Sequence, residues 1–170
     1  MKLVKLLEKS KVSIVKKWVK SFADSYAKET STFLIKKSDE FANPVGDVVK
    51  YALNALYDDF LQDQNDIKKH LEPIIKIRAI QPFTPSKAIS FIFSLKNIIR
   101  DDLQKELAKS ESLQKELFFI DSKIDEMCLA AFDNYMECKD KIFQIQISEV
   151  NDKAFRALER AGLLVNKNNN

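Results

Sequence analysis

Only two glycines, Gly46 and Gly162, occur in this chain of 170 residues. Phosphate-binding loops, nucleophile elbows and two-residue hairpin turns depend on glycine, which adopts positive φ freely and lets another backbone approach closely. Two isolated glycines cannot build any of these motifs. Apolar residues instead recur at intervals of three and four among strong helix formers, and this pattern predicts an all-α fold.

Length and composition indicate one domain. The chain is 45% hydrophobic and contains twelve phenylalanines, enough for a single buried core. No apolar run approaches the roughly 18 residues of a membrane span, and the charged N-terminus is unlike a signal peptide. We expect a single domain over residues 1–165, a disordered polar tail over 166–170 and a soluble, cytoplasmic protein.

The N-terminal segment is strongly basic. Residues 1–37 hold ten lysines against three acidic residues, whereas the whole chain has a net charge of only +3. On a helix, five of the lysines share one face: Lys2, Lys5, Lys9, Lys16 and Lys20. Such a face suits an anionic membrane surface, nucleic acid or an acidic partner, but we favour a core-packed helix with solvated lysines. Nucleic acid is disfavoured because the chain has few arginines, on which base and phosphate recognition relies.

Caps and prolines predict where the helices begin and end. A first helix is expected over residues 3–27, with a break allowed near Ser10, and a short one over 30–37. Asn43-Pro44 and Thr84-Pro85 each place a capping residue before a proline, which predicts helices over 44–63 and 85–107. Pro73 suits a first helical turn better than an interior, so a helix boundary is expected between Lys69 and Glu72.

The last helix is expected to be unusually long. Ser110 is its predicted N-cap, and the absence of proline and glycine up to Ala161 predicts one helix of about 50 residues, or two with a kink. Gly162 is its predicted C-cap. Its first part carries a heptad-like apolar seam: Leu117, Asp121, Ile124, Cys128, Ala131, Tyr135, Cys138, Ile142 and Ile145.

Near Ser148 the apolar stripe of this helix moves to another face. The new stripe consists of Ile147, Val150, Ala154, Leu158 and Ala161. One interpretation is that the helix leaves the core and presents a dimer face to a second copy. The alternative is a frayed helix folded back on its own domain, and both remain open from the sequence.

Residues suited to catalysis or metal binding are scarce. His70 is the only histidine, which excludes a histidine-based triad and a multi-histidine metal site, and we expect it on the surface. Cys128 and Cys138 lie ten residues apart on one predicted helix, which separates their Cα atoms by about 15 Å, too far for a disulfide. We expect both residues in the core. We therefore predict no catalytic residue, metal or cofactor, and a protein that is not an enzyme.

One segment combines an arginine with a rigid turn and a new helix N-terminus. Arg78, Thr84 and Ser86 could receive a small anion or an acidic partner, because the first N–H groups of a helix lack internal partners. The alternative is a tight corner between helices, in which Arg78 satisfies carbonyls or pairs with a carboxylate. We favour the corner.

Four segments together resemble the N-terminal domain of the RsbRD type of RsbT co-antagonist proteins, over about residues 14–161. These segments are Phe41–Gly46 (FANPVG), Ile77–Ala88 (IRAIQPFTPSKA), Phe91–Lys96 (FIFSLK) and Ala131–Cys138 (AFDNYMEC). The resemblance implies an all-helical sensor or regulatory module of bacterial stress signalling. Related co-antagonists have dimeric, globin-like N-terminal domains that bind no haem and project from a large signalling assembly. No active site is carried over.

The chain departs from that resemblance in one respect. Co-antagonists of this kind continue into a STAS domain that takes part in phosphorylation, and this sequence stops at Asn170. Either it is a stand-alone module or a piece of a longer protein, and its polar ending favours a natural terminus. We expect a globin-like helical bundle that homodimerises through its last helix and associates with STAS-domain proteins or their switch kinase. The alternative is a small-ligand-binding or redox-accessory protein with a Phe-rich pocket near Arg78.

Overall fold

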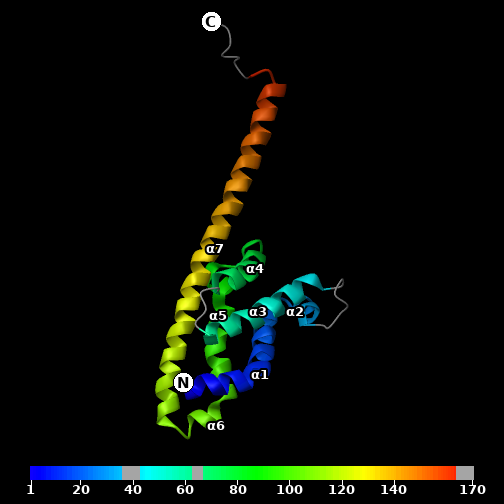
Figure 1. Ribbon diagram of the computed structural model, residues 1–170. Helices are drawn as coiled ribbons and strands as arrows, with labels where there is room; N and C mark the ends of the chain where they lie inside the picture. The colour runs from blue at the N-terminus through cyan, green and yellow to red at the C-terminus, as the bar shows by residue number, and fades with distance from the viewer. Residues whose placement is uncertain (36–42, 63–66, 164–170) are drawn as a thin grey trace.

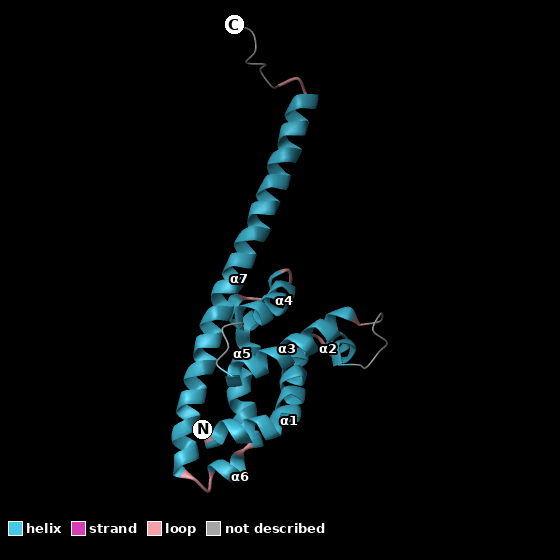
Figure 2. Cartoon of the chain, in the orientation of Figure 1, coloured by secondary structure: helices cyan, strands magenta, loops and turns pink. Residues whose placement is uncertain are grey.

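The computed structural model describes residues 1–35, 43–62 and 67–163, which form seven α-helices and no strand (Figure 2). The helices are α1 (Lys2–Asp24), α2 (Lys28–Ile35), α3 (Pro44–Gln62), α4 (Ile67–Ala79), α5 (Pro85–Asp102), α6 (Gln104–Leu107) and α7 (Glu111–Arg160). The all-α, single-domain fold with a long C-terminal helix is therefore confirmed. The globin-like arrangement stays a prediction, and the tail predicted over 166–170 lies outside the described residues.

The predicted helix caps are present. Asn43 Oδ1 accepts a hydrogen bond from the Gly46 N–H at 2.9 Å, and Thr84 Oγ1 accepts one from the Lys87 N–H at 3.4 Å. Ser110 Oγ accepts from the Leu113 N–H at 3.4 Å and begins α7. These side chains satisfy N–H groups that have no partner inside the helix.

Gly162 ends α7 as predicted. Its φ is +66°, a conformation that favours glycine. The Gly162 N–H donates to the Glu159 carbonyl at 3.1 Å, and the Leu163 N–H donates to the Leu158 carbonyl at 3.0 Å. This pair of bonds is a Schellman motif, which satisfies carbonyls at the end of the helix.

Two expected helix boundaries were wrong, and a third that was only allowed is absent. Pro73 lies inside α4, where the buried Leu71, Ile74 and Ile75 hold the helix together across the missing hydrogen bond. The break allowed near Ser10 does not occur, and α1 is continuous. The helix predicted over 85–107 is divided at Leu103, a buried residue with φ −106°, so that α5 ends at Asp102.

The core lies where α1, α3, α4 and α5 pack beside the first half of α7 (Figure 1). Buried aromatic residues also link the helices through hydrogen bonds. Trp18 Nε1 donates to the Phe91 carbonyl at 2.7 Å, and the Tyr135 hydroxyl donates to the Phe83 carbonyl at 2.8 Å. The first half of α7 is thus part of the body of the domain, whereas its second half extends beyond the other helices.

Candidate functional site

The second half of α7 projects from the domain. Its buried residues end at Cys138, and every described residue from Phe143 to Leu163 is exposed. Figure 1 shows this half as a straight rod that passes beyond the other helices. At 1.5 Å per residue, residues 143–160 extend about 27 Å. The prediction that the helix leaves the core is confirmed, and the fold-back alternative is wrong.

An exposed apolar stripe runs along this projecting half, and we call it the α7 stripe. It consists of Phe143, Ile147, Val150, Ala154, Leu158 and Ala161. Their spacing of three and four residues places them on one face of the helix. Phe143 is 52% exposed, and Phe143, Ile147 and Val150 border a shallow depression. No other described part of the chain covers this face.

The sequence pattern predicted the stripe from Ile147 onward but not Phe143. Leu129, Met136, Phe143 and Val150 are seven residues apart in succession, and all are exposed. This heptad spacing indicates that Phe143 belongs to the exposed stripe. The predicted seam obscured it because that seam was extended to Ile145. That extension was wrong: Ile145 is 60% exposed, because the bundle no longer reaches it.

Arg78 forms a corner between α4 and the end of α1. The residue is 0% exposed. Its Nη2 atom donates to the Phe22 carbonyl at 3.2 Å and to Ser25 Oγ at 2.7 Å. Both acceptors belong to the last turn of α1 or its C-cap, where carbonyls lack partners inside the helix. Arg78 therefore supplies hydrogen bonds to the end of α1, in agreement with the predicted corner between helices.

Aromatic rings surround the Arg78 guanidinium. Its Cζ atom lies 4.0 Å from the ring centre of Phe22, 4.5 Å from that of Tyr26 and 4.7 Å from that of Phe83. These distances suit cation–π attraction, which is stronger where water is excluded. Burial lowers the pKa of Arg78 to about 10, so the group remains charged at neutral pH. Its Nε and Nη1 atoms have no hydrogen-bond partner among the described residues.

Thr84 and Ser86 do not join Arg78 in one site. Both are exposed at the start of α5, with their hydroxyl oxygens 3.3 Å apart. Arg78 instead faces the end of α1, with the Phe83 ring packed against it. The structure thus brings Thr84 and Ser86 together as a helix start and holds Arg78 separately inside the core.

His70 is not the surface residue that the sequence suggested. Its side chain is 19% exposed, and Nδ1 is hydrogen-bonded to Oδ2 of Asp59, whose side chain is 8% exposed. The charged neighbours of His70 in the sequence misled the prediction. They lie on other faces of α4, while His70 turns toward α3.

Cys128 and Cys138 are buried and free, as predicted. Burial raises the pKa of Cys128 to about 12, so its thiol keeps its proton at neutral pH. A protonated thiol is a weak nucleophile and a poor metal ligand. These residues therefore serve as small members of the core.

The basic face of α1 is solvated. Lys2, Lys5, Lys9 and Lys16 are exposed, and Lys20 pairs with Asp24 on its own helix. Another face of α1 enters the core through Leu3, Leu7, Ile14, Trp18 and Phe22. The favoured interpretation of a core-packed helix with a lysine-rich outer face is confirmed. Among the described residues, no helix has both the length and the apolar character to cross a bilayer.

These features define an all-α domain whose longest helix extends well beyond its own core. The family model for the RsbT co-antagonist protein rsbRD N-terminal domain matches residues 13–150, from within α1 to the middle of the α7 stripe. The chain belongs to this family, as the sequence resemblance predicted. No curated protein and no solved structure matches it.

Proposed function

We propose that the protein is a non-enzymatic, cytoplasmic sensor or regulatory domain of bacterial stress signalling that acts by protein–protein association. Family membership supports the signalling role. The observation that carries the mode of action is the α7 stripe, an apolar face on a helix that has left its own core. Exposed apolar patches of this kind mark interaction surfaces.

The partner on the stripe is a second copy of this chain. Phe143, Ile147, Val150 and Ala154 follow the alternating four- and three-residue spacing by which two helices interlock their side chains. A fully buried Phe, Ile, Val or Leu side chain contributes about 1.5–3 kcal/mol. Each copy contributes the same residues to the interface. Burial of both stripes can therefore offset the entropy lost on association.

Mutation of the stripe tests the dimer. We expect the full chain to be dimeric at tens of micromolar by light scattering, and Ile147→Asp with Leu158→Asp to give a folded monomer. Ile145→Asp is the matched control, because Ile145 is exposed on another face of the same helix. A monomeric wild type, or a control that dissociates equally, contradicts this mechanism.

The signalling partners are STAS-domain proteins or their switch kinase. A tagged full-length chain, used as bait in native lysate, should retain them at moderate salt, as mass spectrometry would show. Recovery of the bait alone, or of an unrelated metabolic complex, would contradict the signalling role. The control bait is the Ile147→Asp, Leu158→Asp variant, which separates binding that needs the dimer from binding that does not.

A small-ligand or redox-accessory role near Arg78 has weaker support. Nε and Nη1 of the guanidinium, which have no hydrogen-bond partner within the described part of the chain, favour it. Against it, aromatic rings already occupy the space on Arg78 at 4.0–4.7 Å. Native mass spectrometry of protein from its own host would show a co-purifying molecule if this role were correct.

A further inference from the structure

An exposed apolar patch lies on the body of the domain, where α5 packs beside the first half of α7 (Figure 1). We call it the body patch, and it consists of Phe93, Leu129, Phe132 and Met136, which are between 40% and 68% exposed. Steps of three and four residues place its α7 members on one face of the helix. The proposed function leaves this patch unused, although contiguous apolar surface marks interaction sites.

Ion pairs between α5 and α7 show that the body patch spans two helices. Lys96 Nζ on α5 lies 2.6 Å from Asp125 Oδ1 on α7, and a second ion pair lies one turn further along α5 and one turn back along α7. The two helices are therefore antiparallel. Phe93 precedes Lys96 by three residues and Leu129 follows Asp125 by four, so the next turn of each helix places these two apolar residues side by side. The patch is thus wider than a single helix face.

The body patch and the α7 stripe form one continuous face. Patch residues recur in the stripe at intervals of eleven: Phe132 with Phe143 and Ala154, and Met136 with Ile147 and Leu158. An 11-residue repeat corresponds to about 3.67 residues per turn, close to the 3.6 of a straight helix, so the face hardly rotates as it passes from the body into the projecting half. Residues 129–161 extend about 48 Å at 1.5 Å per residue. A partner that covered only the stripe would leave the patch in water.

Charges beside this face indicate how a second copy is oriented. Lys139 and Asp140 are adjacent in the sequence, and a step of about 100° around the helix places them on opposite flanks of the face. In a parallel pair each flank meets the opposite flank of the other copy, so Lys139 faces Asp140 twice. An antiparallel pair about the middle of the face brings like flanks together, with Lys139 near Lys153 of the other copy. Lys139 also donates to the Ala79 carbonyl at 3.1 Å, but an ammonium group has three donors and can serve both.

We propose that two copies pair in parallel along residues 129–161 of α7, so that the body patch of one copy packs on the body patch of the other. The inference rests on the proposed dimer and assigns to it an orientation and a contact on the body. Phe93 adds α5 to this contact, which therefore consists of two helices from each copy. Both projecting halves of α7 then leave the dimer at the same end.

Cysteine cross-linking of the full chain tests the orientation. Ala154→Cys and Ala161→Cys each place a small thiol on the shared face. In a parallel pair each thiol faces its own counterpart, so mild oxidation should give a disulfide-linked dimer with either variant. An antiparallel pair about the middle of the face would hold the two copies of residue 161 about 48 Å apart, which excludes a disulfide between them.

Two controls define the result of the cross-linking. The wild type should not cross-link, because Cys128 and Cys138 are buried. Ser148→Cys lies on another face of α7 and should also stay uncrosslinked. If Ala161→Cys failed to cross-link in a protein that sedimentation shows to be dimeric, or if Ser148→Cys cross-linked as readily, the parallel arrangement would be wrong.

Substitution of the body patch tests its part in the contact. Leu129→Lys and Met136→Lys each place two like charges, one from each copy, in an apolar contact, so each should raise the dissociation constant at least about tenfold in sedimentation equilibrium. Neither variant should disturb the helix, because the new lysine lies within one turn of aspartates on its own helix: Asp125 and Asp133, or Asp133 and Asp140. Circular dichroism checks that both remain folded.

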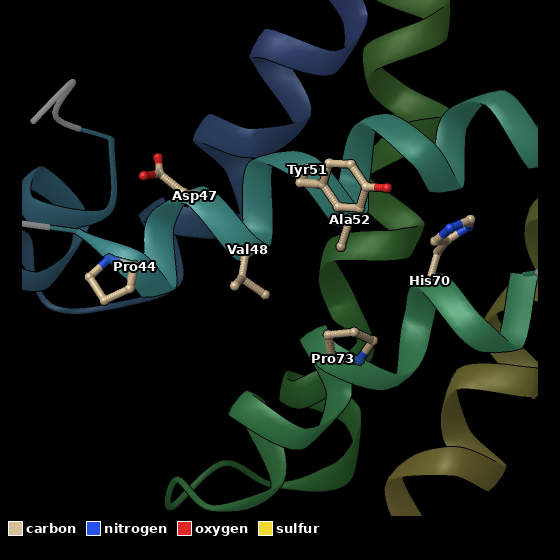
Figure 3. A pocket seen from close by; sticks show the side chains of 7 residues that line it. All are labelled: Pro44, Asp47, Val48, Tyr51, Ala52, His70 and Pro73. Atoms are coloured by element: carbon tan, nitrogen blue, oxygen red, sulfur yellow. The ribbon is translucent and has the colours of Figure 1, made fainter. Parts of the chain in front are cut away.

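Val48→Lys is the matched control for these variants. Val48 is 43% exposed and borders an apolar depression between α3 and α4, helices that the proposed contact does not use (Figure 3). This control should leave the dissociation constant unchanged. If the wild type were dimeric and neither patch variant weakened it more than Val48→Lys, the contact on the body would be overturned while the dimer through the α7 stripe would stand. A monomeric wild type would contradict the proposed dimer and this inference together.

Discussion

Arg78 on α4 donates a hydrogen bond of 2.7 Å to the Ser25 hydroxyl at the end of α1, across 53 residues of sequence. The same Nη2 atom reaches the Phe22 carbonyl, and the Phe22 ring packs on the guanidinium. One side chain thus caps α1, joins it to α4 and fills the space between aromatic rings. Packing and hydrogen bonding at this corner can be separated by substitution.

Arg78→Ala should lower the free energy of unfolding by about 3–4 kcal/mol, because it leaves a cavity between the rings. Arg78→Met keeps most of the volume and removes a buried charge, so it should cost only about 1–2 kcal/mol for the lost caps. Urea unfolding of both variants measures the difference. Equal losses of stability in the two variants would mean that the charge and hydrogen bonds of the guanidinium, rather than its packing, stabilise the corner.

Gly46→Ala should destabilise the protein through Asn43. A Cβ at Gly46 would lie 2.3 Å from Asn43 Nδ2 and would displace the side chain that caps α3 and donates to the Phe33 carbonyl at the end of α2. Loss of the cap and the link should cost about 1–3 kcal/mol. In an Asn43→Ala background the clash is gone, so Gly46→Ala should be neutral or stabilising. If the stability losses of Gly46→Ala and Asn43→Ala were additive in the double variant, this explanation would be wrong.

The sequence was most informative where local rules decide the structure. Asn43, Thr84, Ser110 and Gly162 were identified as caps because capping depends on residues only a few positions away. Pro73 was misplaced because its local preference is overridden by packing against other helices. The partnership of His70 with Asp59 joins two helices, and no spacing rule encodes it. Similarly, the aromatic surroundings of Arg78 come from α1, α5 and the turn before α5.

Stability should fall above pH 10, in part because of Tyr57. Burial raises the pKa of Tyr57 well above its usual value, with smaller contributions from Asp102 and Asp58. The unfolded chain therefore loses this proton near pH 10, while the folded chain keeps it, so stability present below pH 10 is lost as the pH rises.

Urea unfolding between pH 8 and pH 11 measures this dependence. Tyr57→Phe should lose about 1 kcal/mol at pH 8 with its hydrogen bond to the Leu7 carbonyl, and should show a shallower alkaline decline. Tyr51→Phe, at an exposed tyrosine, is the control and should follow the wild type. Identical slopes in all three proteins would exclude Tyr57 as a source.

Pro73→Ala should stabilise the folded protein by about 1–2 kcal/mol. It restores a helical N–H to the Lys69 carbonyl, a gain reduced by the greater freedom of alanine in the unfolded chain. Thermal unfolding by circular dichroism measures the change. A loss of stability would show that contacts of the proline ring outweigh the hydrogen bond, and that its place in α4 is a packing requirement.

Phe143→Ala should weaken the dimer by about tenfold or more. Phe143 lies where α7 leaves the body, and one aromatic side chain from each copy would be lost from the interface. Sedimentation equilibrium of the full chain gives the dissociation constant. Ile145→Ala removes a comparably exposed apolar side chain from another face of the helix and should leave the constant unchanged. If Phe143→Ala had no effect while Ile147→Asp with Leu158→Asp still gave a monomer, the contact between copies would begin beyond Phe143 and involve only the distal part of the stripe.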